Sequence, residues 1–167
     1  MQIERQVTID APADEVWKVL AHRFGDVSKW ASSVSRSTYE PSTSGDTVGS
    51  ERFCATSFGD LKETIVRYDE AGKSLSYRAE GLPSVVTEGV NTWAVHPSGN
   101  NHSVVSMRAE MTLKPGIGLV VGPVMKLQLG KALGQVVDEL KYYVETGQLH
   151  PRKIEARAKE AKRSPAR

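Results

Sequence analysis

Apolar and polar residues alternate with a period of two along much of the chain between residues 34 and 114. Such runs are typical of strands with one buried face, and short segments rich in Gly, Pro, Asp or Asn separate them here. Links that short join antiparallel neighbours, because a parallel crossover needs about a dozen residues or more. The pattern predicts a six-stranded meander, with strands near 34–40, 47–56, 61–69, 74–80, 87–97 and 103–113.

The residues that precede the meander predict one more strand and two short helices. Residues 2–10 alternate in the same way, and we expect them to form a strand that pairs with the edge of the meander. Arg5 is an exception to the pattern, because it lies on the same side as the apolar residues of this strand. Helical spacing then predicts a helix over about residues 12–22 and a second, shorter one over residues 24–30.

After Pro115 the apolar period changes to 3.6 residues, which predicts one long amphipathic helix. We expect this helix to begin between Gly118 and Pro123 and to end at Gly147, which can cap it. The helix is long enough to cross the concave face of a curved sheet. Its apolar stripe consists of Met125, Leu129, Ala132, Leu133, Val136, Val137, Leu140, Tyr143 and Val144.

Two glycines, Gly130 and Gly134, lie inside this predicted helix. Each costs about 1 kcal/mol relative to alanine in a helix interior, so their presence needs a reason. One interpretation is close packing against the sheet or against a second chain, which leaves a homodimer open. The other is that they make room for a ligand.

Charge is unevenly distributed along the 167 residues, whose formal net charge is +2. Residues 150–167 contain seven Lys or Arg and two Glu, a balance of +5, so residues 1–149 carry about −3. We expect one folded domain over residues 1–149, whose mildly acidic balance argues against nucleic-acid binding. Residues 150–167 are too poor in apolar side chains to dock firmly, and we expect a basic, frayed or disordered tail that ends at Ser164–Pro165.

Several kinds of site and location are not expected. The N-terminus lacks a basic segment followed by an apolar one, and no apolar run approaches the ~20 residues of a membrane-spanning helix, so we expect a cytoplasmic protein. The single cysteine, Cys54, excludes an internal disulfide and is expected to be a small core residue. The four histidines are scattered, which predicts no metal site. Gly116–Gly122 approaches a dinucleotide-binding fingerprint, but its third glycine is one place late and no βαβ unit surrounds it, so we expect no cofactor.

Five segments resemble a known superfamily. They are Ile9 to Trp17 (IDAPADEVW), Phe24 to Trp30 (FGDVSKW), Gly59 to Ile65 (GDLKETI), Leu75 to Tyr77 (LSY) and the end of the long helix, Leu140 to Glu145 (LKYYVE). In this order the chain resembles the START-like, or helix-grip, superfamily (SRPBCC), and within it the bacterial polyketide cyclase/dehydrase-type proteins. The likeness covers about residues 3–147.

The resemblance implies an α+β fold, in which a seven-stranded curved antiparallel sheet surrounds the long C-terminal helix. Two short helices lie between the first and second strands. It also implies a deep pocket between sheet and helix for sterols, lipids, polyketides or other apolar molecules. Most members of the superfamily have no metal and no cofactor; some are aromatase/cyclases, and many only bind or carry ligands.

Polar residues on strands with apolar neighbours are the candidates for the pocket wall. Glu63 shares a face with Leu61, so we expect it to point inward, with Arg52 as its partner. Arg108 and Glu110 are expected to point outward. For every candidate the alternative interpretation is structural packing without ligand contact. The predicted ligand-binding residues are Trp30, Tyr39, Arg52, Glu63, Tyr77, Asn91, Trp93, Met107, Met111, Met125 and Gln128.

Three functions remain open at this point. In the first, the protein binds a small hydrophobic ligand (a lipid, polyketide or aromatic compound), and Arg52, Glu63 and Asn91 orient the polar end of that ligand. In the second, it is a polyketide cyclase/dehydrase-type enzyme, and Glu63, Tyr77 and Arg52 are the candidate catalytic groups. In the third, it is an interaction module whose basic tail binds an acidic partner, a membrane surface or nucleic acid.

Overall fold

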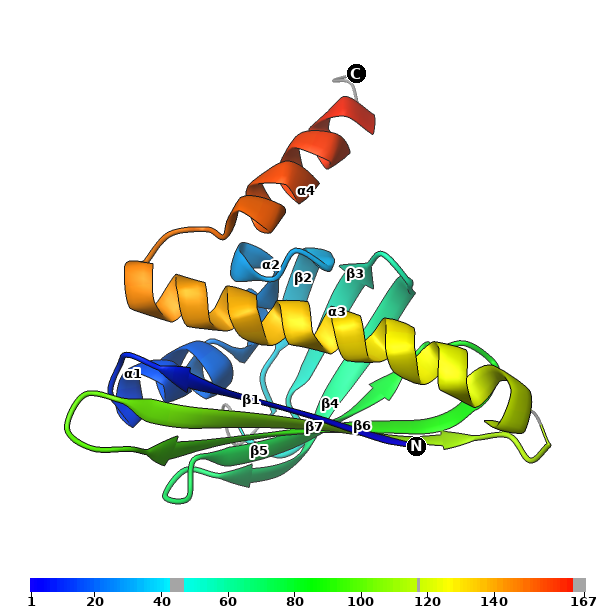
Figure 1. Cartoon of the computed structure of the whole chain (residues 1–167), viewed down its shortest axis with the longest axis horizontal. Coiled ribbons are helices and arrows are strands. Elements are labelled where there is room, and N and C mark those ends of the chain that lie inside the picture. The colour runs from blue at the N-terminus through cyan, green and yellow to red at the C-terminus, as the bar shows by residue number, and fades with distance from the viewer. Residues whose placement is uncertain (43–46, 117, 164–167) are drawn as a thin grey trace.

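The computed structural model, which describes residues 1–42, 47–116 and 118–163, contains one seven-stranded antiparallel sheet (Figure 1). The strand order is β1-β7-β6-β5-β4-β3-β2, so the six later strands form a meander and β1 pairs with its edge, as predicted. The helix-grip arrangement expected from the sequence is confirmed. The strands are β1 (Gln2–Ile9), β2 (Val34–Glu40), β3 (Glu51–Thr56), β4 (Gly59–Asp69), β5 (Ser74–Glu80), β6 (Val86–Pro97) and β7 (Ser103–Leu113).

Four short helical segments follow β1 and close one end of the sheet. They correspond to the two helices predicted there, each divided in two. Their apolar side chains, which include Val16, Trp17 and Phe24, are buried in the core. The segments are α1 (Ala13–Trp17), η1 (Lys18–His22), η2 (Phe24–Asp26) and α2 (Val27–Trp30).

The Glu70 carboxylate, just after β4, ties this end of the sheet to the short helices. Its Oε2 atom accepts hydrogen bonds from the indole nitrogen of Trp17 at 2.8 Å and from the hydroxyl of Tyr68 at 2.7 Å. These two bonds, with a smaller contribution from His22, lower the pKa of Glu70 to about 2. The carboxylate therefore stays ionised, and remains an acceptor for Trp17, well below neutral pH.

The long helix α3 (Gly118–Thr146) crosses the sheet, as the 3.6-residue period predicted (Figure 1). Its C-terminal half is the better buried, with Val137 and Leu140 in the core. Gly147 follows the helix with a positive φ of 67° and donates its N–H to the carbonyl of Tyr143, which is the predicted glycine cap. In the described part of the chain, no helix is both long enough and apolar enough to cross a bilayer.

Arg5, the polar residue on the apolar side of β1, contacts α3 at Gly130. Its Nε and Nη2 atoms donate to the carbonyl of Gly130 at 3.2 and 2.8 Å. A Cβ atom on Gly130 would lie 2.7 Å from Nη2 of Arg5, and one on Gly134 would lie 3.5 Å from its Nε. Gly130 therefore favours the packing interpretation, since its missing side chain lets the guanidinium approach the helix backbone, whereas a side chain on Gly134 would make only an ordinary contact with Arg5.

The C-terminal segment differs from the prediction. Instead of a frayed or disordered tail, residues Pro151–Arg163 form helix α4, which rises from the end of α3 beside α2 and β2 (Figure 1). Polar groups hold it: Arg152 Nε donates to Glu139 Oε1 at 2.8 Å, and the buried Lys153 Nζ donates to the Val34 carbonyl at 2.7 Å. The prediction was wrong because it considered only apolar residues, and polar contacts hold this helix. Ser164 and Pro165 lie outside the described residues.

Candidate ligand pocket

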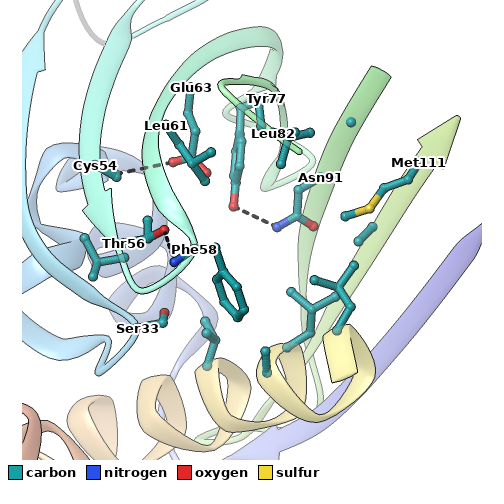
Figure 2. Close-up of a pocket in the computed structure, with 18 of the residues that line it drawn as sticks. Ser33, Cys54, Thr56, Phe58, Leu61, Glu63, Tyr77, Leu82, Asn91 and Met111 are labelled. Carbon is teal, nitrogen blue, oxygen red and sulfur yellow. Dashed lines mark hydrogen bonds between the residues drawn. The ribbon is translucent and has the colours of Figure 1, made fainter. Parts of the chain in front are cut away.

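A cavity of about 300 Å³ lies between the inward face of the sheet and α3. Apolar side chains from β3 to β7, from the β5–β6 loop and from α3 make up most of its wall (Figure 2). Phe58, in the turn between β3 and β4, lines the cavity and is 63% exposed, which places it at the rim. Cavities of this size and lining are typical of small-molecule sites.

An ion pair, Arg52 with Glu63, is set into this apolar wall. The two residues are cross-strand partners on β3 and β4, so the register of the sheet brings their side chains together. Nε of Arg52 donates to Oε2 of Glu63, and the two side chains are only 8% and 11% exposed. The prediction that Glu63 points inward with Arg52 as its partner is correct.

Aromatic and backbone groups complete the surroundings of Arg52. Its Nη1 donates to the carbonyl of Phe24 at 2.7 Å, and its Cζ atom lies 3.8 Å from the centroid of the Phe24 ring. The Tyr77 ring lies on another side, 4.9 Å from Cζ. Burial opposes the charge, but the Glu63 carboxylate more than compensates and raises the pKa of Arg52 above its usual value. The guanidinium is therefore a permanent cation whose charge is neutralised inside the wall.

A second polar group, made by Tyr77, Asn91 and Trp93, lies on the neighbouring strands. Tyr77 of β5 and Asn91 of β6 are cross-strand partners, and Nδ2 of Asn91 donates to the Tyr77 hydroxyl at 2.7 Å (Figure 2). The indole nitrogen of Trp93 donates to the same oxygen at 3.5 Å. Burial, together with the charge of Glu63, raises the pKa of Tyr77 to about 12. The phenol therefore keeps its proton at neutral pH.

Cys54 is both a core residue and part of the cavity wall. It is buried, as predicted, and its thiol donates to Oε2 of Glu63 at 3.6 Å. Burial raises the pKa of the thiol to about 12. Since the thiolate is the nucleophilic form, this cysteine is unsuited to covalent catalysis.

The structure brings most of the predicted ligand-binding residues to one cavity, although ligand contact itself stays a prediction. Arg108 and Glu110 are exposed, as expected. Trp30 and Tyr39, which were expected near the pocket mouth, are outside the lining. The predicted residues that line the cavity are Arg52, Glu63, Tyr77, Asn91, Trp93, Met107, Met111, Met125 and Gln128.

Packing accounts for the two exceptions. Trp30 is 4% exposed and belongs to the hydrophobic core at the end of α2. The Tyr39 ring packs edge-on against Phe24, with 6.2 Å between ring centroids, and its Cβ lies where a side chain on Gly25 would be. Both aromatic residues therefore support the short helices instead of facing the cavity.

Sequence reasoning missed several residues of the rim. Phe58, Leu82 and Pro83 line the cavity from two hairpin turns that were interpreted only as chain reversals. An apolar residue in an otherwise polar turn, such as Phe58 before Gly59–Asp60, is the signal that could have found them. Within the described ranges, no three His, Cys, Asp or Glu side chains gather closely enough to hold a metal ion.

Most of the chain is similar to a known protein family. Residues 1–145 match the family described as "Polyketide cyclase / dehydrase and lipid transport". A START superfamily protein from Mycobacterium smegmatis has a similar structure, with a TM-score of 0.71 and 14% identity, covering 88% of this chain and 99% of that one. No curated protein is significantly similar to the chain.

Two further solved structures share the fold. A protein from Thermobifida fusca is 25% identical, with a TM-score of 0.70, and the match covers 89% of this chain and 96% of that one. Norcoclaurine synthase from Thalictrum flavum, in complex with dopamine and hydroxybenzaldehyde, is 20% identical, with a TM-score of 0.65 over 90% of this chain and 89% of that one. Proteins with this architecture thus include at least one enzyme.

Proposed function

The chain belongs to the polyketide cyclase/dehydrase and lipid transport family, and from this membership together with its cavity we propose that it binds a small hydrophobic ligand between the sheet and α3. The observation that carries the proposal is the cavity of about 300 Å³ itself, walled mostly by apolar side chains. Tightly packed interiors contain few voids larger than a water molecule, so a space of this size is an exception to ordinary core packing. Burial of apolar ligand surface would supply most of the affinity, at ~25 cal/mol per Å² before the costs of association.

Catalysis of a polyketide cyclisation is the second candidate, because Arg52, Glu63 and Tyr77 meet in the cavity wall. Such a reaction needs a proton donor and a proton acceptor that are free to reach the substrate. Here the Glu63 carboxylate is engaged by Arg52, and Tyr77, with a pKa of about 12, can donate a hydrogen bond but is a poor base at neutral pH. The geometry therefore favours binding over acid–base chemistry.

Filling the cavity from α3 is expected to abolish uptake of an apolar probe. Ala132 lines the cavity, and Ala132→Phe would put an aromatic ring into the space that a ligand needs. We expect wild-type protein to bind the neutral dye N-phenyl-1-naphthylamine saturably, with enhanced fluorescence. The affinity of Ala132→Phe is expected to fall by about 10-fold or more, equivalent to ~1.4 kcal/mol.

The matched control is Lys131→Phe, which adds the same ring at the adjacent, exposed position of α3. This variant is expected to bind the dye as the wild type does. Circular dichroism would establish that both variants fold. Equal dye binding by Ala132→Phe and Lys131→Phe, with both folded, would show that the dye binds outside the cavity.

A further inference from the structure

The Asn91 side chain has a polar atom that nothing else in the described structure uses. Its Nδ2 donates to the Tyr77 hydroxyl, but its Oδ1 is buried and has no hydrogen-bond partner among residues 1–42, 47–116 and 118–163. The oxygen lies away from Tyr77, on the side of Met111, and both residues line the cavity (Figure 2). Buried polar atoms in native proteins are nearly always hydrogen-bonded, so whatever fills the cavity should supply a partner.

The Tyr77 hydroxyl adds a donor next to this acceptor. It receives the N–H groups of Asn91 and Trp93, so its own proton is left to point elsewhere. If the amide of Asn91 is rotated by half a turn, the roles exchange: the hydroxyl donates to Oδ1 and the amide N–H₂ faces the cavity. In the first arrangement Asn91 offers the cavity an acceptor, and in the second it offers a donor. A ligand group that can both donate and accept would satisfy Asn91 in either case.

In the part of the chain that the structure describes, the cavity wall offers no free charge that could pair with a charged ligand. Among the described residues that line the cavity, Arg52 and Glu63 are the only charged ones, and they neutralise each other. A carboxylate or an ammonium group in the cavity would be attracted by one partner of the pair and repelled by the other, so the pair selects neither sign of charge. Either ion would also lose its hydration in an apolar space without gaining a free counter-charge.

We propose that the ligand is a neutral, mostly apolar molecule with a hydroxyl group that hydrogen-bonds to Asn91 and Tyr77. The inference rests on the proposed function and names the ligand class for the same cavity. A hydroxyl can both donate to Oδ1 and accept from a neighbouring donor, so it fits either orientation of the amide. The rest of the molecule would lie against the apolar side chains of the sheet and α3.

Three probes with one ring system test this: 2-methylnaphthalene, 2-naphthol and 2-naphthoate, titrated calorimetrically at neutral pH. We expect wild-type protein to bind 2-naphthol about 10-fold more tightly than 2-methylnaphthalene, and 2-naphthoate most weakly. Asn91→Leu is expected to remove the preference for 2-naphthol while keeping the affinity for 2-methylnaphthalene within about 3-fold. Asn101→Leu, the same change at an exposed position outside the cavity lining, should keep the preference.

The outcomes separate the two proposals. Equal affinity for 2-methylnaphthalene and 2-naphthol, or tightest binding of 2-naphthoate, would overturn this inference and leave hydrophobic ligand binding intact. Failure of all three probes to bind would overturn both. If Asn91→Leu does not fold, Tyr77→Phe carries the same test, because it removes the hydroxyl of the pair and is expected to reduce the preference for 2-naphthol in the same direction.

Discussion

Arg52→Leu is expected to lower the free energy of unfolding by about 3–5 kcal/mol, which is the usual cost of breaking a buried ion pair by removing one partner. The variant would leave the Glu63 carboxylate in an apolar wall without its counter-charge, since Arg52 is the cation that Glu63 contacts there. It would also remove the guanidinium that lies on the Phe24 ring and donates to the Phe24 carbonyl. Urea unfolding measured by circular dichroism would give the free energy.

Two further variants show whether the pair itself is responsible. Arg52→Leu combined with Glu63→Leu removes both charges, and replacing a whole buried ion pair by apolar residues is often neutral or stabilising. We therefore expect the double variant to recover most of the lost stability. Arg36→Leu, at an exposed position on β2, is the control for the arginine-to-leucine change. A loss for Arg52→Leu as small as that for Arg36→Leu would contradict this account.

The second large effect is expected at the junction of α3 and α4. Arg152→Ala should destabilise the protein by about 2–3 kcal/mol, because it removes the cation that is paired with the fully buried Glu139. The expected loss is below that for Arg52 because Arg152 is 33% exposed and Ser32 still donates its backbone N–H and its hydroxyl to the same carboxylate. The free energy of unfolding in urea again provides the measurement.

Arg157→Ala is the matched control on the same helix. Arg157 is exposed and donates one bond, at 3.3 Å, to the carbonyl of Lys29, so its removal should cost no more than about 0.5 kcal/mol. Equal losses of unfolding free energy for Arg152→Ala and Arg157→Ala would mean that the buried Glu139 carboxylate does not need Arg152 as its counter-charge. Deleting α4 would remove Arg152, the cation paired with Glu139, together with exposed charges such as Lys159, so that deletion would not test the basic charges alone.

The fold could be predicted from the sequence because its signals are local. Six strands separated by short turns leave antiparallel pairing as the simple solution, and one long amphipathic helix then has a single concave face to cover. The helix α4 could not be predicted in this way. Its anchors are polar contacts that no apolar period marks: Arg152 binds Glu139, 13 residues away, and Lys153 binds the carbonyl of Val34, 119 residues away.

The cavity wall was predictable where alternation along a strand decides the direction of a side chain. Arg52, Glu63, Asn91 and Trp93 all follow from this rule, since their neighbours two residues away are buried or line the same cavity. Trp30 lies in a short helix, where the packing of the whole end of the sheet decides what the ring faces. That Oδ1 of Asn91 has no hydrogen-bond partner among the described residues likewise follows only from the positions of its neighbours in space.

The measurement that tests ligand binding in this cavity most directly is NMR of protein labelled with ¹³C at the methionine methyl groups. Of the four methionines, Met107, Met111 and Met125 line the cavity and Met1 does not, so the chain contains its own control. With 2-methylnaphthalene bound, we predict nuclear Overhauser effects from the ring protons to the methyl groups of those three residues and none to Met1. Binding of the same compound with contacts to Met1 alone, or with no contact to the other three, would contradict a ligand site between the sheet and α3.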